Sequence, residues 1–254
     1  MRTARSILIP MAAVGWMLAT TVQAQASAPD ISGFWAPSFE PGPRDQSLLD
    51  KLPPDTVLVE DTGVEEFPRG EFGGLKLKPD ALRHAEQWQP ENDMSLQRVC
   101  LVPSIVYSIQ GPFPFEIIQT AEVTIFKYEY FDQIRLIYTD GRAHPPADAP
   151  HTKMGFSTGR WEGDELVVET SHIAASTITN NGLDHSDDVR MVERYRLQGD
   201  GKTLAATQWF SDPSVLDNNG ARYIAWSSRP GEYVNPYECD PSFALEYSQI
   251  GQSQ

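Results

Sequence analysis

The sequence predicts an all-β protein, built as an antiparallel meander that closes into a barrel of broadly lipocalin-like shape. Two observations support this prediction. From residue 115 onward, short runs of β-branched and aromatic residues are separated by turns rich in Gly and Asp. No helical segment intervenes between these runs, so consecutive strands are expected to pair as neighbours. Such a meander buries one face against a second sheet or by closing on itself, and we favour closure.

The expected strands are short and closely spaced. They cover 115–119, 123–131, 134–138, 155–161, 165–173, 189–197, 203–210 and 223–227. Tight turns at 162–164 and 198–201 contain Gly and Asp, which suit hairpin connections. The strands define an antiparallel β core over 106–240, within one domain that covers 27–254.

The part of the chain before this core, residues 27–105, is rich in Pro, Gly, Ser and Asp, and it predicts irregular structure. One short helix is expected near 79–88. Pro79 suits a first helical turn and Asp80 suits the positive end of the helix dipole. The apolar side of this helix would be formed by Ala81, Leu82, Ala85 and Trp88.

Residues 1–26 have the layout of a cleavable signal peptide. Arg2 and Arg5 precede an apolar stretch at 7–19, and small residues follow at the positions that a signal peptidase reads, ending at Ala24 or Ala26. The stretch is shorter than the roughly 20 residues that span a bilayer, and it contains Pro10. We therefore expect a periplasmic or secreted protein that has no membrane segment after cleavage.

Charge and cysteine content narrow the partners and cofactors. The formal net charge of −15 becomes −17 once Arg2 and Arg5 are removed, which disfavours nucleic acid as a partner. The two cysteines, Cys100 and Cys239, favour a disulfide in an oxidising compartment, with two free thiols as the alternative. No phosphate loop or dinucleotide fingerprint occurs, so we expect no organic cofactor.

Several segments together resemble a widespread family of secreted bacterial proteins. They are 114–120 (PFEIIQT), 140–145 (DGRAHP), 159–170 (GRWEGDELVVET), 185–186 (HS) and 192–195 (VERY). The resemblance covers roughly residues 75–240. It implies an all-β fold, export, and pairing of the two cysteines, but it assigns no reaction. The chain departs from the family pattern at 102–104, where VPS replaces a GxP sequence after the first cysteine.

One expected strand carries a carboxylate in an apolar row. Because alternate residues of a strand share a face, Glu193 points the same way as Met191 and Tyr195. A buried carboxylate is costly unless it is paired or protonated. Glu193 is therefore expected either to act as a general acid or base with a raised pKa or to pair with an arginine. The candidate partners are Arg142, Arg160 and Arg194.

Two histidines are candidate bases. His185 lies in the acidic stretch 184–188, which is expected as a loop at the barrel mouth, where a carboxylate would hold its ring. His144 follows the turn at 140–142 and precedes two prolines. Arg142 or Tyr130 would stabilise a developing oxyanion. The alternative is that these histidines lie in solvated turns. A serine triad is not indicated, because no Gly-x-Ser-x-Gly elbow is present.

The histidines are also compatible with a metal centre. His172, expected at the inner end of strand 165–173, would join His144 and His185 as ligands of a divalent metal. The spacing contains neither HxH nor HExxH, so independent histidines are the alternative.

Three functions are therefore compatible with the sequence. The first is an exported enzyme whose barrel cup binds a small, partly apolar organic molecule and performs cofactor-free acid/base chemistry of a lyase, isomerase or hydrolase type. The second is a non-catalytic carrier or sensor of the same ligand. The third is a metal-dependent enzyme that uses the histidines.

Overall fold

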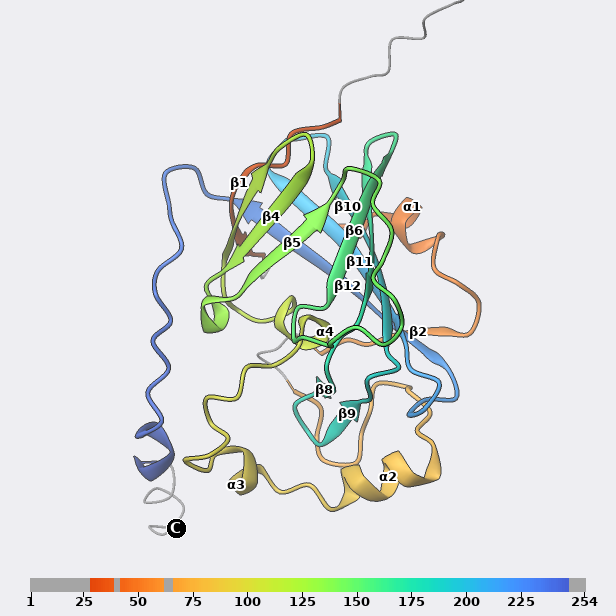
Figure 1. Ribbon diagram of the computed structural model, residues 1–254, viewed down its shortest axis with the longest axis vertical. Helices are drawn as coiled ribbons and strands as arrows, with labels where there is room; N and C mark the ends of the chain where they lie inside the picture. Colours follow the sequence, from red (N-terminus) through yellow and green to blue (C-terminus); the bar gives the residue numbers. More distant parts are fainter. Residues whose placement is uncertain (1–27, 39–41, 62–65, 247–254) are drawn as a thin grey trace, which may run out of the picture.

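The computed structural model describes residues 28–38, 42–61 and 66–246 (Figure 1). The expected signal peptide, residues 1–26, lies outside the described residues. The main element is a closed barrel, as predicted; it has nine strands, one more than the eight expected. The strands are β1 (Gly33–Pro37), β3 (Phe115–Gln119), β4 (Val123–Tyr128), β5 (Ile134–Tyr138), β6 (Phe156–Glu162), β7 (Glu165–Ser171), β10 (Arg190–Leu197), β11 (Thr203–Ser211) and β12 (Asn219–Ser228).

The barrel is closed by β1, which lies far from the other strands in the sequence. Its residue Trp35 pairs with Phe115 of β3 on one side and with Ser228 of β12 on the other. A short strand, β2 (Thr56–Leu58), adds to the start of β12 in parallel. The expected strands all form, although β4 and β7 end earlier than predicted, at Tyr128 and Ser171.

One neighbouring pair within the barrel is not antiparallel, contrary to the predicted meander. β5 and β6 run parallel, with Ile137 opposite Ser157 and Tyr138 opposite Thr158. Parallel neighbours require a connection that returns the chain to the starting end, which a tight turn cannot provide. Residues 139–155 form that crossover, and they carry His144 and His151.

Most of the remaining elements lie at one end of the barrel, whereas α1 lies beside the barrel strands (Figure 1). The expected helix forms as α2 (Pro79–Glu86), and the others are α1 (Gln46–Leu49), α3 (Pro90–Asp93), α4 (Ile105–Ser108), the 3-10 turn Tyr130–Asp132 and the hairpin of β8 (Ser176–Thr179) and β9 (Leu183–His185). In Figure 1, α4 sits against the barrel end, with β8, β9, α2 and α3 beyond it. None of the helices in the described part of the chain is long and apolar enough to cross a membrane.

The barrel interior is filled by side chains. Phe115 contacts Trp226 at 5.1 Å and stacks on Phe126 at 5.5 Å, and Phe126 meets Tyr195 at 5.3 Å between ring centroids. Offset and edge-to-face contacts of this kind stabilise a packed core. The interior at this level is therefore a core and not the open cup that we expected to hold a ligand.

A buried ion pair fixes the barrel end to the segments beyond it. Arg222 of β12 donates from Nε and Nη2 to the two carboxylate oxygens of Asp61, each at 2.9 Å. The same guanidinium donates to the carbonyls of Val106 in α4 and Ile178 in β8, at 2.9 and 2.6 Å. These bonds hold α4 and β8 in fixed positions, so the surface between them rests on rigid elements.

Candidate functional site

The candidate site is a cleft of about 930 Å³ at the helical end of the barrel. Its walls come from α2, from α4 and from the segment that joins α3 to α4. The 3-10 turn at 130–132 and the hairpin of β8 and β9 complete the lining. Ligand sites of small organic molecules have volumes of this order and combine apolar walls with a few polar groups.

Aromatic residues supply much of the apolar lining of the cleft, which we call the aromatic wall. Trp88, Tyr107, Tyr130 and Phe131 all line it. Phe131 has a φ of 56°, a left-handed conformation that is unfavourable for a bulky side chain. Its ring packs at 4.7 Å from those of Tyr130 and Tyr237, and these contacts hold the strained turn in place. Strain of this kind, retained beside a cleft, marks a candidate functional position.

Tyr107 links the floor of the cleft to an acidic side chain. Its hydroxyl donates to Oε1 of Glu66 at 2.5 Å, and the other oxygen of Glu66 accepts from the Asn180 amide at 3.4 Å. Burial raises the pKa of Tyr107, and the hydrogen bond to Glu66 raises it further. Tyr107 therefore stays protonated at neutral pH and offers the cleft an aromatic surface.

His185, the first candidate base, lies at the cleft but has both ring nitrogens engaged. Nε2 is 2.7 Å from Oγ of Ser104, and Nδ1 is 2.9 Å from the carbonyl oxygen of Ser186. Because a carbonyl only accepts, Nδ1 carries the proton and Nε2 accepts from the Ser104 hydroxyl. Burial lowers the pKa of His185, which keeps the ring neutral.

This Ser–His pair resembles the first two members of a hydrolase triad in distance, but it lacks access. Ser104 is 0% exposed and His185 is 2% exposed. Ser186 is fixed in turn by Asp212, which accepts from its amide at 2.6 Å and from its hydroxyl at 3.0 Å. A nucleophile has to reach its substrate, so the pair acts in this conformation as a clamp between α4 and β9.

A different histidine has the arrangement that we expected of His185. His84 of α2 places Nε2 3.2 Å from Oδ2 of Asp184, and both residues line the cleft. The His84 side chain is 68% exposed. Its Nδ1 makes no hydrogen bond within the described residues, which leaves one nitrogen open toward solvent or a ligand. A carboxylate that orients an imidazole with one free nitrogen is the geometry of a general base.

Of the other two histidines proposed as ligands, His144 belongs to the crossover at 139–155, and His172 directly follows β7 and contacts this crossover. His144 places Nδ1 2.7 Å from Oγ of Ser171 and Nε2 2.9 Å from Oγ1 of Thr158. His172, with a φ of 56°, turns away from the strand instead of lying at its inner end, and its Nε2 donates to the carbonyl of Pro146 at 2.9 Å. Its Nδ1 lies 2.7 Å from the same Ser171 hydroxyl.

The structure therefore separates the proposed metal ligands. His144 and His172 meet at Ser171, whereas His185 is bonded to Ser104 beside the cleft. Across 28–38, 42–61 and 66–246, no group of three or more His, Cys, Asp or Glu side chains is arranged to hold a metal ion.

Glu193 pairs with an arginine, which is the structural alternative that the sequence left open, but the partner is none of the three arginines considered. It pairs inside the barrel with Arg135, whose Nη1 lies 3.1 Å from Oε1, and it accepts from the Tyr195 hydroxyl at 2.7 Å. Of the arginines considered, Arg142 instead binds Asp140 at 2.6 Å and lies over the ring of Tyr138. Neither Glu193 nor Arg142 lines the cleft, whereas Tyr130 does.

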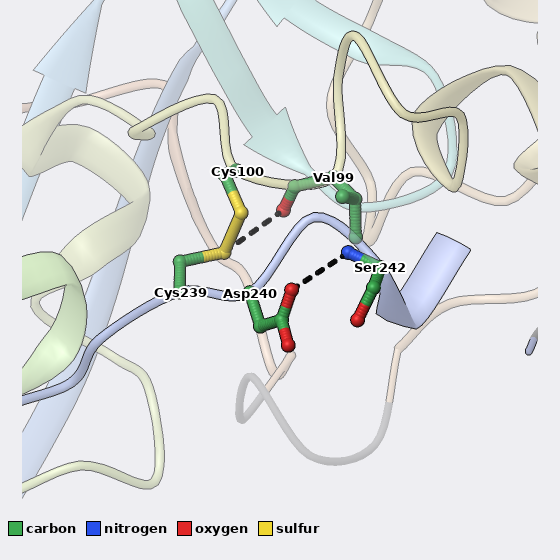
Figure 2. The surroundings of a disulfide bond; sticks show 5 residues. All are labelled: Val99, Cys100, Cys239, Asp240 and Ser242. Atoms are coloured by element: carbon green, nitrogen blue, oxygen red, sulfur yellow. Dashed lines mark hydrogen bonds between the residues drawn. A yellow bond between two sulfur atoms is a disulfide. The ribbon is translucent and has the colours of Figure 1, made fainter. Parts of the chain in front are cut away.

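The predicted disulfide joins Cys100 to Cys239, with 5.9 Å between the Cα atoms (Figure 2). Figure 2 shows the bond beside Val99, with the backbone of Ser242 donating to Asp240 just beyond Cys239. Val99 and Leu101, on either side of Cys100, both line the cleft. The disulfide thus anchors the C-terminal segment to one wall of the candidate site.

Comparison with known protein families finds no family model that matches the chain, and comparison with curated proteins finds no match either. The geometry of the cleft is therefore the main evidence on function. Sequence reasoning missed Ser104, Lys153 and the pairing of His84 with Asp184, because these side chains meet only through long-range contacts. For His84, the one available signal was an exposed histidine on a helix, which is common.

Proposed function

We propose that the protein is exported and that its cleft binds a small, partly apolar organic molecule. The observation that carries this proposal is the 930 Å³ cleft, whose lining combines the aromatic residues Trp88, Tyr107, Tyr130 and Phe131 with polar side chains. The strained backbone at Phe131 supports the same conclusion, because the fold retains an unfavourable conformation that places an aromatic ring in the cleft.

Export is supported by three independent features. The first 26 residues have a signal-peptide pattern, the chain resembles a family of secreted proteins, and Cys100 and Cys239 form a disulfide. Expression of the full chain in a bacterium, followed by fractionation and mass spectrometry, tests export. We expect periplasmic or secreted protein that starts after Ala24 or Ala26, and uncleaved cytoplasmic protein would contradict the proposal.

Ligand binding is tested by a fragment screen with protein-observed NMR. We expect aromatic fragments to shift resonances of the cleft, and we expect Phe131→Ala to weaken the hits at least tenfold. Ile134→Ala is the matched control, because this side chain is 58% exposed on β5, outside the cleft. Hits that bind elsewhere, or that ignore the Phe131 substitution, would contradict binding in the cleft.

A second candidate function is cofactor-free acid/base catalysis on the bound molecule. The observation that favours it is the His84–Asp184 pair at the cleft, with Nδ1 of His84 open. In this proposal His84 is the base, in place of His185, whose ring nitrogens are both engaged. A non-catalytic carrier would bind the same ligand without turnover, so His84 distinguishes the two functions.

A further inference from the structure

Lys153 differs from the other charged groups of the cleft. Its Nζ donates to the carbonyl oxygen of Ala175 at 2.6 Å, and both residues line the cleft. Among the described residues, no carboxylate lies within ion-pair distance of this ammonium group. An ammonium has three donors, so two remain for solvent or a ligand.

The other cation of the cleft is already neutralised. Arg98 donates from Nε to Asp93 at 3.0 Å, and the second oxygen of Asp93 accepts from the Trp88 indole at 2.6 Å. Asp184 is 3.2 Å from His84, and its charge, like that of Asp187, also acts on Lys153 from beyond ion-pair distance. Lys153 is thus the cleft cation whose charge lacks a direct partner among the described residues. Burial lowers the pKa of Lys153, while the charges of Asp184 and Asp187 act in the opposite direction.

We infer that the ligand of this cleft is an aromatic monocarboxylate, whose carboxylate binds Lys153 and whose ring packs on the aromatic wall. This inference rests on the proposed function and specifies its ligand class. A carboxylate would supply the acceptors that Lys153 lacks, and charge-assisted hydrogen bonds of this kind are the strong ones.

The arrangement of the cleft determines which end of the ligand lies at Lys153 and which lies near Tyr107. Lys153 is bonded to Ala175, just before β8, and Asn180, just after it, is bonded to Glu66, which holds Tyr107. An extended chain rises about 3.3 Å per residue and β8 has an irregular register near Thr177, so Ala175 and Asn180 lie at most about 16 Å apart. The cation and the aromatic wall near Tyr107 are therefore separated, and several bonds should join the carboxylate to the ring.

The charge at the far end excludes a second carboxylate. Glu66 lies beside Tyr107, and its charge also acts on the hydroxyl of Tyr130. A dicarboxylate would bring a like charge toward Glu66, which costs free energy in a partly buried site. The ligand is therefore assigned a single anionic group.

Three probes of equal length test this inference: 4-phenylbutanoate, 4-phenylbutanamide and 4-phenylbutylamine. Affinities are measured by isothermal titration calorimetry with the full mature protein. We expect the carboxylate to bind at least tenfold more tightly than the amide and the amine. We expect Lys153→Met to abolish this difference and Lys153→Arg to retain most of it. Lys127→Met is the matched control, because Lys127 is exposed on β4 and does not line the cleft.

The outcomes separate this inference from the proposed function. Equal binding of the three probes, weakened by Phe131→Ala, would overturn the carboxylate assignment and leave the cleft as a binding site. A preference for the carboxylate that survives Lys153→Met would also overturn the assignment. If none of the probes binds, the ligand class is wrong. The proposed function itself fails only if the fragment screen also finds nothing in the cleft.

Discussion

Arg135 and Glu193 face each other inside the barrel, where their side chains are 1% and 0% exposed. Around them, Ser157 and Thr170 accept hydrogen bonds from the guanidinium at 3.0 and 2.7 Å, and the Tyr195 hydroxyl donates to the carboxylate. Two charges in a packed interior are stable only when each satisfies the other, because the barrel offers them no bulk water.

Breaking this pair should destabilise the protein strongly. Glu193→Gln leaves Arg135 buried without a counter-charge, and we expect the free energy of unfolding to fall by about 3–5 kcal/mol. The combined variant Arg135→Met/Glu193→Leu removes both charges and should be more stable than the single variant. Urea unfolding followed by fluorescence gives the values.

The matched control for that experiment is Arg160→Gln. Arg160 pairs with Glu162 and Glu169 on the barrel surface, where its side chain is 53% exposed. Exposed pairs contribute about 0–1 kcal/mol, so this change should be mild. A Glu193 variant no less stable than the Arg160 variant would contradict the account of a buried ion pair.

The stability of the protein should decrease when the pH falls below about 6.5. Burial lowers the pKa of His185 and of His144 below the ordinary value of 6.5. The unfolded chain therefore takes up these protons first, so both histidines stabilise the fold fully above 6.5 and progressively less as the pH falls toward their folded values. Each contributes at most about 1.4 kcal/mol per pH unit.

His185→Gln tests this pH dependence. We measure the free energy of unfolding at pH 7.5, 6.5 and 5.5 for both proteins. The variant should be less stable at pH 7.5, because it loses the buried ring that joins Ser104 to the Ser186 carbonyl, yet it should lose less stability on acidification. Parallel pH profiles for the two proteins would show that His185 does not titrate as its burial requires.

Removing the disulfide should loosen the wall of the cleft as well as the whole fold. The bond closes a separation of 139 residues and anchors Tyr237, whose ring packs on Phe131. We expect Cys100→Ser/Cys239→Ser to lower the free energy of unfolding by about 2–5 kcal/mol. Hydrogen exchange should become faster in 229–246 and in the turn at 130–132. Unchanged exchange in that turn would mean that the anchor does not support the cleft.

Chemical modification distinguishes His84 from His185. Diethyl pyrocarbonate acylates a free imidazole nitrogen, so His84, with an open Nδ1, should react well before His185, whose ring nitrogens are both engaged. Peptide mass spectrometry identifies the modified positions over time. A cleft ligand should protect His84, and preferential modification of His185 would restore the latter as the candidate base.

The barrel was predictable from the sequence because its signals are local. Turns such as 162–164, between strands of alternating polarity, determine a hairpin within some 15 residues, and β6 and β7 form as expected. The parallel contact of β5 with β6 was missed, because it depends on where the crossover at 139–155 returns in space. Pairing of β1 with β12 was missed for the same reason.

The candidate site was only partly predictable. Tyr130 and His185, which the sequence offered as candidates, both line the cleft, but residues that contact them come from distant segments. The sequence placed Glu193 correctly on the inner face of its strand, yet Arg135 reaches it from a strand 58 residues away. An ion pair across a barrel depends on strand order and register, which local patterning does not encode.

Closure of the barrel by β1 has a consequence for the order in which its strands can pair during folding. Trp35 pairs with Ser228, so the last wall of the barrel forms between nearly opposite ends of the described chain. Until β12 has been synthesised, β1 has no second neighbour, and the growing sheet exposes a row of unpaired amides that invites association with other chains. Contacts of such sequence separation also slow folding. We therefore expect the nascent chain to be prone to aggregation until its last strand is available.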